Sequence, residues 1–120
     1  MDIETFRKYC LSKKGVTEEF PFGPETLVFK VGGKMFALCG LENVPFKINL
    51  KCDPERAQEL REEHEAYIEG AFHMNKKHWN SLIPQSLPPA LVSELIDHSY
   101  ELVLAGLPKS KQQEIKNSQI

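Results

Sequence analysis

Two adjacent glycines, Gly32 and Gly33, separate two segments rich in strand-forming residues, 26–31 and 34–39. Both glycines tolerate the positive φ angles of a two-residue hairpin loop, so the pattern predicts an antiparallel hairpin. Directly paired residues share a face of a sheet. The predicted pairs are therefore Val31 with Lys34, Phe29 with Phe36, and Leu27 with Leu38. The expected core face carries Leu27, Phe29, Val31, Phe36 and Leu38, and the other face carries Val28, Lys30, Met35, Ala37 and Cys39.

A further strand is predicted over residues 45–52, where apolar and polar residues alternate. The apolar set that points inward is Phe46, Ile48, Leu50 and Cys52. The outward set is Lys47, Asn49 and Lys51, and in a shared sheet it lies on the same face as Lys30. The pattern therefore predicts a solvated, mildly basic sheet face.

Helices are predicted over 2–14 and 53–65, each with an aspartate at its N-cap, and from Pro88-Pro89 to Gly106. Short strands are expected at 66–72 and 78–83. This order predicts an α+β fold, a two-layer sandwich with a mostly antiparallel sheet and helices on one face. Residues 1–107 are expected to form a single domain, and the polar segment 108–120 is expected to fray.

Composition excludes several classes of protein. The net charge of −2 argues against coating nucleic acid through bulk charge, although residues 26–52 carry +3 and residues 53–69 carry −5. Three scattered cysteines fit reduced thiols in the cytoplasm. The first residues lack a signal-peptide pattern, and no apolar run approaches the roughly 18 residues of a membrane span, so no membrane partner is expected.

The segment 72–80 concentrates aromatic, histidine, lysine and asparagine side chains. Its lysines can contact phosphates, and Phe72 and Trp79 can stack on bases. The favoured alternative for the two aromatics is a role as core anchors, and Lys76-Lys77 can equally be a solvated turn. His73 and His78 lack the spacing of a metal-binding helix, so no metal site is predicted.

No catalytic motif is present: Ser99 lies between His98 and Tyr100, but adjacent helical residues point in different directions. We therefore expect neither an enzyme nor a cofactor.

Several motifs occur in a specific order along the chain. They are Pro21-Phe22-Gly23-Pro24-Glu25-Thr26, Phe29 to Phe36, Asn49-Leu50-Lys51-Cys52-Asp53-Pro54, His73 to Asn80, and His98-Ser99-Tyr100. In this order they resemble the MmcQ/YjbR family of small bacterial proteins over about residues 1–107. The resemblance implies a CyaY-like fold and DNA binding, without catalytic residues or iron binding. By position it implies contacts from Lys34, Asn75, Lys76, Lys77, His78 and Trp79.

The leading hypothesis is a non-enzymatic cytoplasmic binding protein, monomeric, with DNA as the candidate partner. The candidate contact residues are Lys30, Lys34, Lys47, Lys51, Asn75, Lys76, Lys77, His78 and Trp79. The main alternative is a protein–protein adaptor that uses the exposed sheet face. A third hypothesis is a small-ligand protein or enzyme with a pocket around His73, His78 and Tyr100.

Overall fold

The first two helices begin where the sequence supplies N-caps. In the computed structural model, which describes residues 1–118, the Asp2 carboxylate accepts a hydrogen bond from the Thr5 amide at 2.9 Å. The Asp53 carboxylate accepts one from the Arg56 amide at 3.1 Å. Each bond satisfies an amide that has no partner inside the helix. The described elements are α1 (Ile3–Leu11), β1 (Val16–Glu19), β2 (Thr26–Val31), β3 (Lys34–Gly40), β4 (Ile48–Lys51), α2 (Pro54–Glu63), β5 (Ile68–Gly70), β6 (Trp79–Leu82), the 3₁₀ turn η1 (Pro84–Ser86), α3 (Pro89–Ala105) and α4 (Lys109–Lys116).

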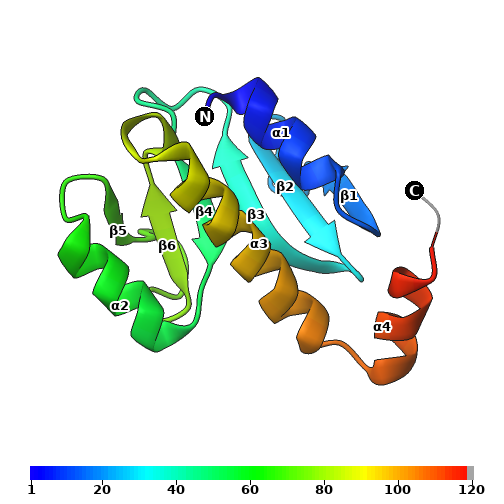
Figure 1. The fold of residues 1–120 in the computed structure, drawn as a ribbon. Coiled ribbons are helices and arrows are strands. Elements are labelled where there is room, and N and C mark those ends of the chain that lie inside the picture. Colours follow the sequence, from blue (N-terminus) through cyan, green and yellow to red (C-terminus); the bar gives the residue numbers. More distant parts are fainter. Residues whose placement is uncertain (119–120) are drawn as a thin grey trace.

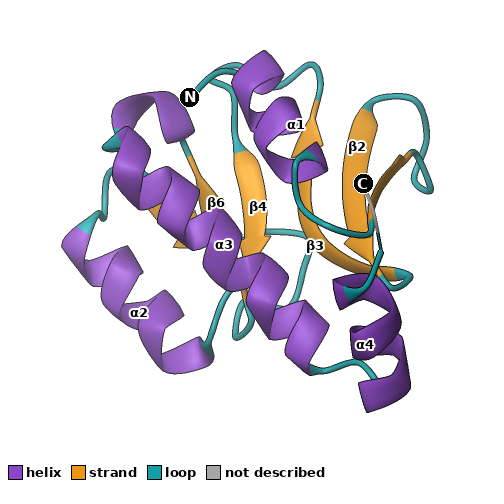
Figure 2. Cartoon of the chain, turned by 45° about the vertical axis from the view of Figure 1, so that its right-hand side comes forward, coloured by secondary structure: helices purple, strands orange, loops and turns teal. Residues whose placement is uncertain are grey.

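The six strands form one sheet in the order β1-β2-β3-β4-β6-β5, and every neighbouring pair is antiparallel. Helices α1, α2 and α3 cover one face, here named the helix face (Figures 1 and 2). The opposite face is named the outer face. The predicted α+β class, with helices on one face of the sheet, is confirmed.

The main core lies between the helices and the helix face. Phe6 on α1 meets Phe29 edge to face, with ring centroids 5.4 Å apart, and Phe36 meets Tyr100 on α3 at 5.6 Å. Edge-to-face geometry is favoured by aromatic quadrupoles, so both contacts fix helices onto the sheet. Ile48 and Leu50 are buried in the same core, as the alternation in this strand predicts.

The hairpin register differs from the prediction because β3 bulges. Val31 pairs with Lys34 and Lys30 with Met35, but Phe29 pairs with Ala37, which leaves Phe36 as an extra residue. A bulge reverses the alternation beyond it. The main core therefore contains Phe36, Ala37 and Cys39, whereas Leu38 is buried on the outer face. The predicted faces of Ala37, Leu38 and Cys39 were therefore wrong.

Helix α3 is fixed to three separate segments by consecutive residues. His98 accepts a hydrogen bond from the Asp53 amide, and Tyr100 donates one to the Lys14 carbonyl at 2.6 Å. The buried Ser99 hydroxyl accepts from the Lys51 amide at 3.0 Å and donates to the Phe36 carbonyl. The His98-Ser99-Tyr100 motif therefore organises packing.

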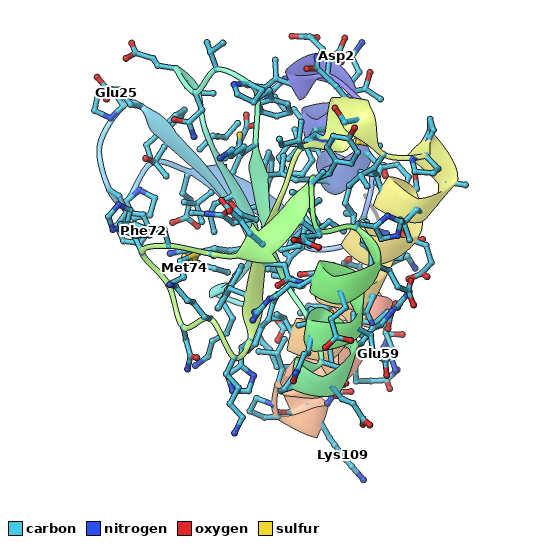
Figure 3. All side chains as sticks on the ribbon, turned by 90° about the vertical axis from the view of Figure 1, so that its left-hand side faces the viewer. Asp2, Glu25, Glu59, Phe72, Met74 and Lys109 are labelled. Atoms are coloured by element: carbon cyan, nitrogen blue, oxygen red, sulfur yellow. The ribbon has the colours of Figure 1, made fainter. Side chains whose placement is uncertain are left out.

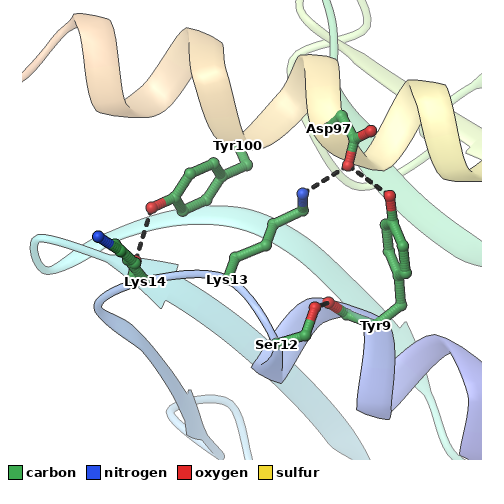
Figure 4. A network of polar contacts seen from close by, with 6 residues as sticks. All are labelled: Tyr9, Ser12, Lys13, Lys14, Asp97 and Tyr100. Atoms are coloured by element: carbon green, nitrogen blue, oxygen red, sulfur yellow. Dashed lines mark hydrogen bonds and ion pairs between the residues drawn. The ribbon is translucent and has the colours of Figure 1, made fainter. Parts of the chain in front are cut away.

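A polar network joins the end of α1 to α3 (Figure 4). Tyr9 donates to the Asp97 carboxylate at 2.7 Å, and the Lys13 ammonium pairs with the same oxygen. The hydrogen bond to Asp97 raises the pKa of Tyr9 to about 12. Partial burial alone raises the pKa of Asp97, but the bonds from Lys13 and Tyr9 outweigh it and lower that pKa below its usual value.

Most of the segment 108–120, predicted to fray, is folded, and its last two residues lie outside the described part of the chain. Residues 109–116 form α4, and Ile115 is buried against the main core. Gly15, at φ +73°, leaves the space that the Ile115 side chain occupies, and Gly32 does the same for Leu107. The Lys14 ammonium donates to the Lys116 carbonyl at 3.0 Å. Helix α4 thus packs beside the β2–β3 hairpin (Figure 1).

The two edge strands are short. β1, which the sequence pattern did not reveal, has four residues, and β5 has three. Their glutamates pair with cations of the same protein: Glu18 with Arg7, Glu19 with Lys30, and Glu69 with Lys47.

Candidate binding surfaces on the outer face

The outer face carries a second apolar cluster. Val28, Leu38, Ala71 and Trp79 are buried there, and Met35 and Met74 pack against them. Ala71 and Met74 belong to the β5–β6 loop, residues 71–78, which folds over the sheet. The outer face is therefore partly covered, whereas the sequence predicted a solvated, mildly basic surface.

Hydrogen bonds hold this loop in place. Arg61 on α2 donates to the Asn80 side chain at 2.6 Å and also to the Lys76 carbonyl. The Asn75 side chain accepts from the Lys77 amide at 3.0 Å, and the Asn75 carbonyl accepts from the amides of His78 and Trp79. Asn75 therefore shapes the loop that presents Lys76 and Lys77.

The two aromatics of segment 72–80 have different roles. The Trp79 residue is 8% exposed and lies in the outer-face cluster, as expected of a core anchor. Phe72 is 78% exposed, so its prediction as a core anchor was wrong. The Lys76 ammonium lies 5.5 Å from the centroid of the Phe72 ring, within the range of a cation–π contact.

Strand register and ion pairing together divide the predicted lysines into groups. The start of β3, the end of β4 and the start of β6 meet at one end of the antiparallel sheet. Lys34, Lys51 and Lys77 lie at this end, here named the lysine end, and none of them pairs with an acid among the described residues. Lys30, opposite Met35 and close to the same end, pairs with Glu19 at 3.2 Å. Lys47, before the start of β4, pairs with Glu69 at 3.6 Å.

The structure adds a lysine that sequence reasoning missed. Lys111 on α4 lines a hollow beside Gly32 and Gly33, but Glu114 lines the same hollow and pairs with Lys111 at 3.9 Å, so α4 adds no uncompensated positive charge there. The sequence signal for α4 was Pro108 followed by good helix formers and a single apolar residue, Ile115. The helix was missed because one apolar residue gives no helical periodicity.

The predicted pocket around His73, His78 and Tyr100 does not form. Tyr100 is buried on the helix face, and the carbonyl of His78 accepts from the Cys52 amide at the end of β4. His73 instead borders a cavity of about 590 Å³ on the outer face. The lining residues are Phe22, Glu25, Thr26, Met35, Leu38, Gly40, Glu42, Asn43, Asn49, His73, Met74 and Asn75.

The potential nucleophiles serve packing. All three cysteines are buried, and burial raises the pKa of Cys39 and of Cys52 to about 11, which keeps both thiols protonated. Within residues 1–118, no three histidine, cysteine or acidic side chains lie close enough to hold a metal ion. No helix in this part of the chain is long and apolar enough to span a membrane.

Comparisons with known proteins agree in fold and sequence. The YjbR family model matches residues 11–102. The uncharacterized protein YbdF of Escherichia coli O157:H7 is 43% identical over 115 residues, covering 94% of this chain and 93% of YbdF. The uncharacterized protein YjbR of E. coli K12 is 32% identical over 114 residues, covering 93% and 95%.

Two crystal structures are similar to this chain. Deinococcus radiodurans protein DR2400, with a DUF419 domain, has a TM-score of 0.89 at 38% identity and covers 95% of this chain and 87% of that one. A structural-genomics target from Pseudomonas syringae, PsR293, has a TM-score of 0.72 at 27% identity, covering 86% and 99%.

Proposed function

The chain belongs to the YjbR family, and on its geometry we propose that it is a non-enzymatic protein that binds nucleic acid through the lysine end of its sheet. The observation that carries the proposal is the grouping of Lys34, Lys51 and Lys77. Three strands bring them to one end, and no described acid neutralises them. Unpaired ammonium groups are suited to phosphate contacts, because binding releases the counterions condensed on the nucleic acid.

The remaining candidates have supporting roles in this proposal. Asn75 shapes the loop, and the buried Trp79 anchors it, so neither is presented for base stacking. The lysines therefore contact the backbone without reading sequence. Three phosphate contacts give a slope of about −3 in a plot of log affinity against log salt concentration on duplex DNA.

Fluorescence anisotropy with labelled duplex and single-stranded DNA at low ionic strength tests the proposal. The variant Lys34→Ala/Lys51→Ala/Lys77→Ala should lose most of the binding. Lys8→Ala/Lys30→Ala/Lys47→Ala removes the same charge from α1 and from two ion-paired lysines, and should retain binding near the parent level. The proposal fails if the parent does not bind, or if the two triple variants weaken binding equally.

A second candidate function, a protein–protein adaptor, is favoured by exposed apolar residues in three loops. The exposed fractions are 63% for Phe22, 78% for Phe72 and 95% for Val44. Phe22 lines the outer-face cavity, and Phe72 lines a hollow next to it. The cavity and the hollow share the lining residues Asn43 and His73. Pull-down from lysate with and without nuclease separates the candidates, because a direct protein partner survives nuclease treatment.

A further inference from the structure

The cavity on the outer face has the size and the apolar floor of a small-molecule site. Its volume of about 590 Å³ falls inside the range of about 300–1,000 Å³ that is usual for such sites. Met35, Leu38 and Met74 line it, and the same three side chains contact the buried Trp79 cluster. The floor is therefore supported from below by packed side chains.

Three loops form the walls. Phe22 and Glu25 come from the β1–β2 loop, Glu42 and Asn43 from the β3–β4 loop, and residues 73–75 from the β5–β6 loop. The Leu41 amide donates to the Glu25 carbonyl at 2.7 Å, which joins the first two loops beside the cavity. In Figure 3, Glu25, Phe72 and Met74 lie on the same side of the molecule, away from Glu59 on α2.

Apart from His73, the ionisable side chains of the lining are acids. Glu25 and Glu42 are its acids, no lysine or arginine lines it, and neither acid forms an ion pair within residues 1–118. Two uncompensated carboxylates at a concave surface attract a cation and repel phosphates and carboxylates. The exposed ring of Phe22 adds an aromatic face suited to a cationic group.

We propose that this cavity binds a small organic amine. The ammonium group lies near Glu25 and Glu42, and the apolar body of the ligand rests on Met35, Leu38 and Met74. This site is independent of nucleic-acid binding, because its lining contains none of Lys34, Lys51 and Lys77 and carries the opposite charge.

A matched pair of probes tests the charge preference. 4-Phenylbutylamine and 5-phenylpentanoate carry the same phenyl group and linker and differ in the sign of the terminal charge. Isothermal titration calorimetry gives the affinities, and Trp79, the sole tryptophan, reports through its fluorescence because it packs under the cavity floor. Saturable binding of the amine is expected, with the carboxylate at least about tenfold weaker.

The variant Glu25→Gln/Glu42→Gln locates the site. It should weaken amine binding by about tenfold, while Glu59→Gln/Glu62→Gln, which makes the same charge change on exposed α2, should leave it within about twofold. The inference is overturned if the amine does not bind, if the carboxylate binds equally well, or if the two double variants behave alike. DNA titrations of the same variants distinguish this result from the proposed function, because Glu25 and Glu42 lie outside the lysine end.

Discussion

Ser99 on α3 donates its hydroxyl hydrogen to the carbonyl oxygen of Phe36, the residue at which β3 bulges. The same hydroxyl accepts from the Lys51 amide of β4. The bulge leaves both backbone groups beyond the paired part of the β3–β4 ladder, which begins at Ala37 and Leu50. A helix side chain therefore completes the sheet where its own hydrogen bonding is interrupted.

Replacing this hydroxyl should destabilise the fold. Ser99→Ala leaves buried backbone groups without a partner, and we expect the free energy of unfolding to fall by about 2 kcal/mol. Ser110→Ala, at an exposed position of α4, should change it by less than about 0.5 kcal/mol. Urea denaturation followed by circular dichroism measures both. Equal stability of the two variants would contradict the role assigned to Ser99.

The network at Asp97 predicts a pH dependence. Because its pKa is lowered in the folded state, the ionised carboxylate stabilises the protein above the unfolded value near 3.8, and this contribution is lost as the pH falls through the lower folded pKa. Asp97→Asn should therefore be less stable than the parent at neutral pH, with the difference narrowing below about pH 4. Urea denaturation at a series of pH values measures this gap. Glu101→Gln, at an exposed position of the same helix, serves as the control, and a gap independent of pH would refute the prediction.

Helix α4 should contribute to global stability. Ile115→Ala removes its buried side chain, and we expect a loss of about 2–3 kcal/mol in the free energy of unfolding. Gln113→Ala, on the exposed side of the same helix, should cost less than about 0.5 kcal/mol. Chemical denaturation compares them. If Ile115→Ala unfolds at the parent's urea midpoint, α4 does not pack against the core in solution.

Truncating the two aromatics of segment 72–80 should lower the stability of the fold by different amounts. Trp79→Ala opens a cavity in the outer-face cluster and should cost about 3–4 kcal/mol. Phe72→Ala removes an exposed ring and should cost less than about 0.5 kcal/mol. Thermal unfolding by calorimetry gives both values, and a large loss for Phe72→Ala would place that ring in the core instead.

Sequence patterns predicted where helices and strands lie better than they predicted strand register and long-range packing. The caps at Asp2 and Asp53 and the alternation from Ile48 to Cys52 depend on local geometry, so they were predictable. The bulge at Phe36 was not, because the apolar side chains around it suit either face. The frayed tail was wrong because the burial of Ile115 depends on space left by Gly15, a hundred residues earlier in the chain.

For the candidate sites too, the sequence pointed to a segment of the chain but not to the contacts that form on folding. The family resemblance drawn from ordered motifs is confirmed by the family match and the relatives, and it pointed to the β5–β6 loop. It could not separate the ion-paired Lys30 and Lys47 from the unpaired Lys34, Lys51 and Lys77, because the pairing acids belong to the edge strands. The cavity was missed because its walls come from three loops that meet only after folding.

The short edge strands with their glutamates also bear on how copies of this chain meet. A long, uncharged edge offers a row of free amides and carbonyls on which another molecule can build a fibril. Here each edge ends after three or four residues, and Glu18, Glu19 and Glu69 hold charged ion pairs on these strands, which an incoming strand would have to strip of water. We therefore expect concentrated solutions of this protein to resist edge-to-edge aggregation, even though its loops expose apolar rings.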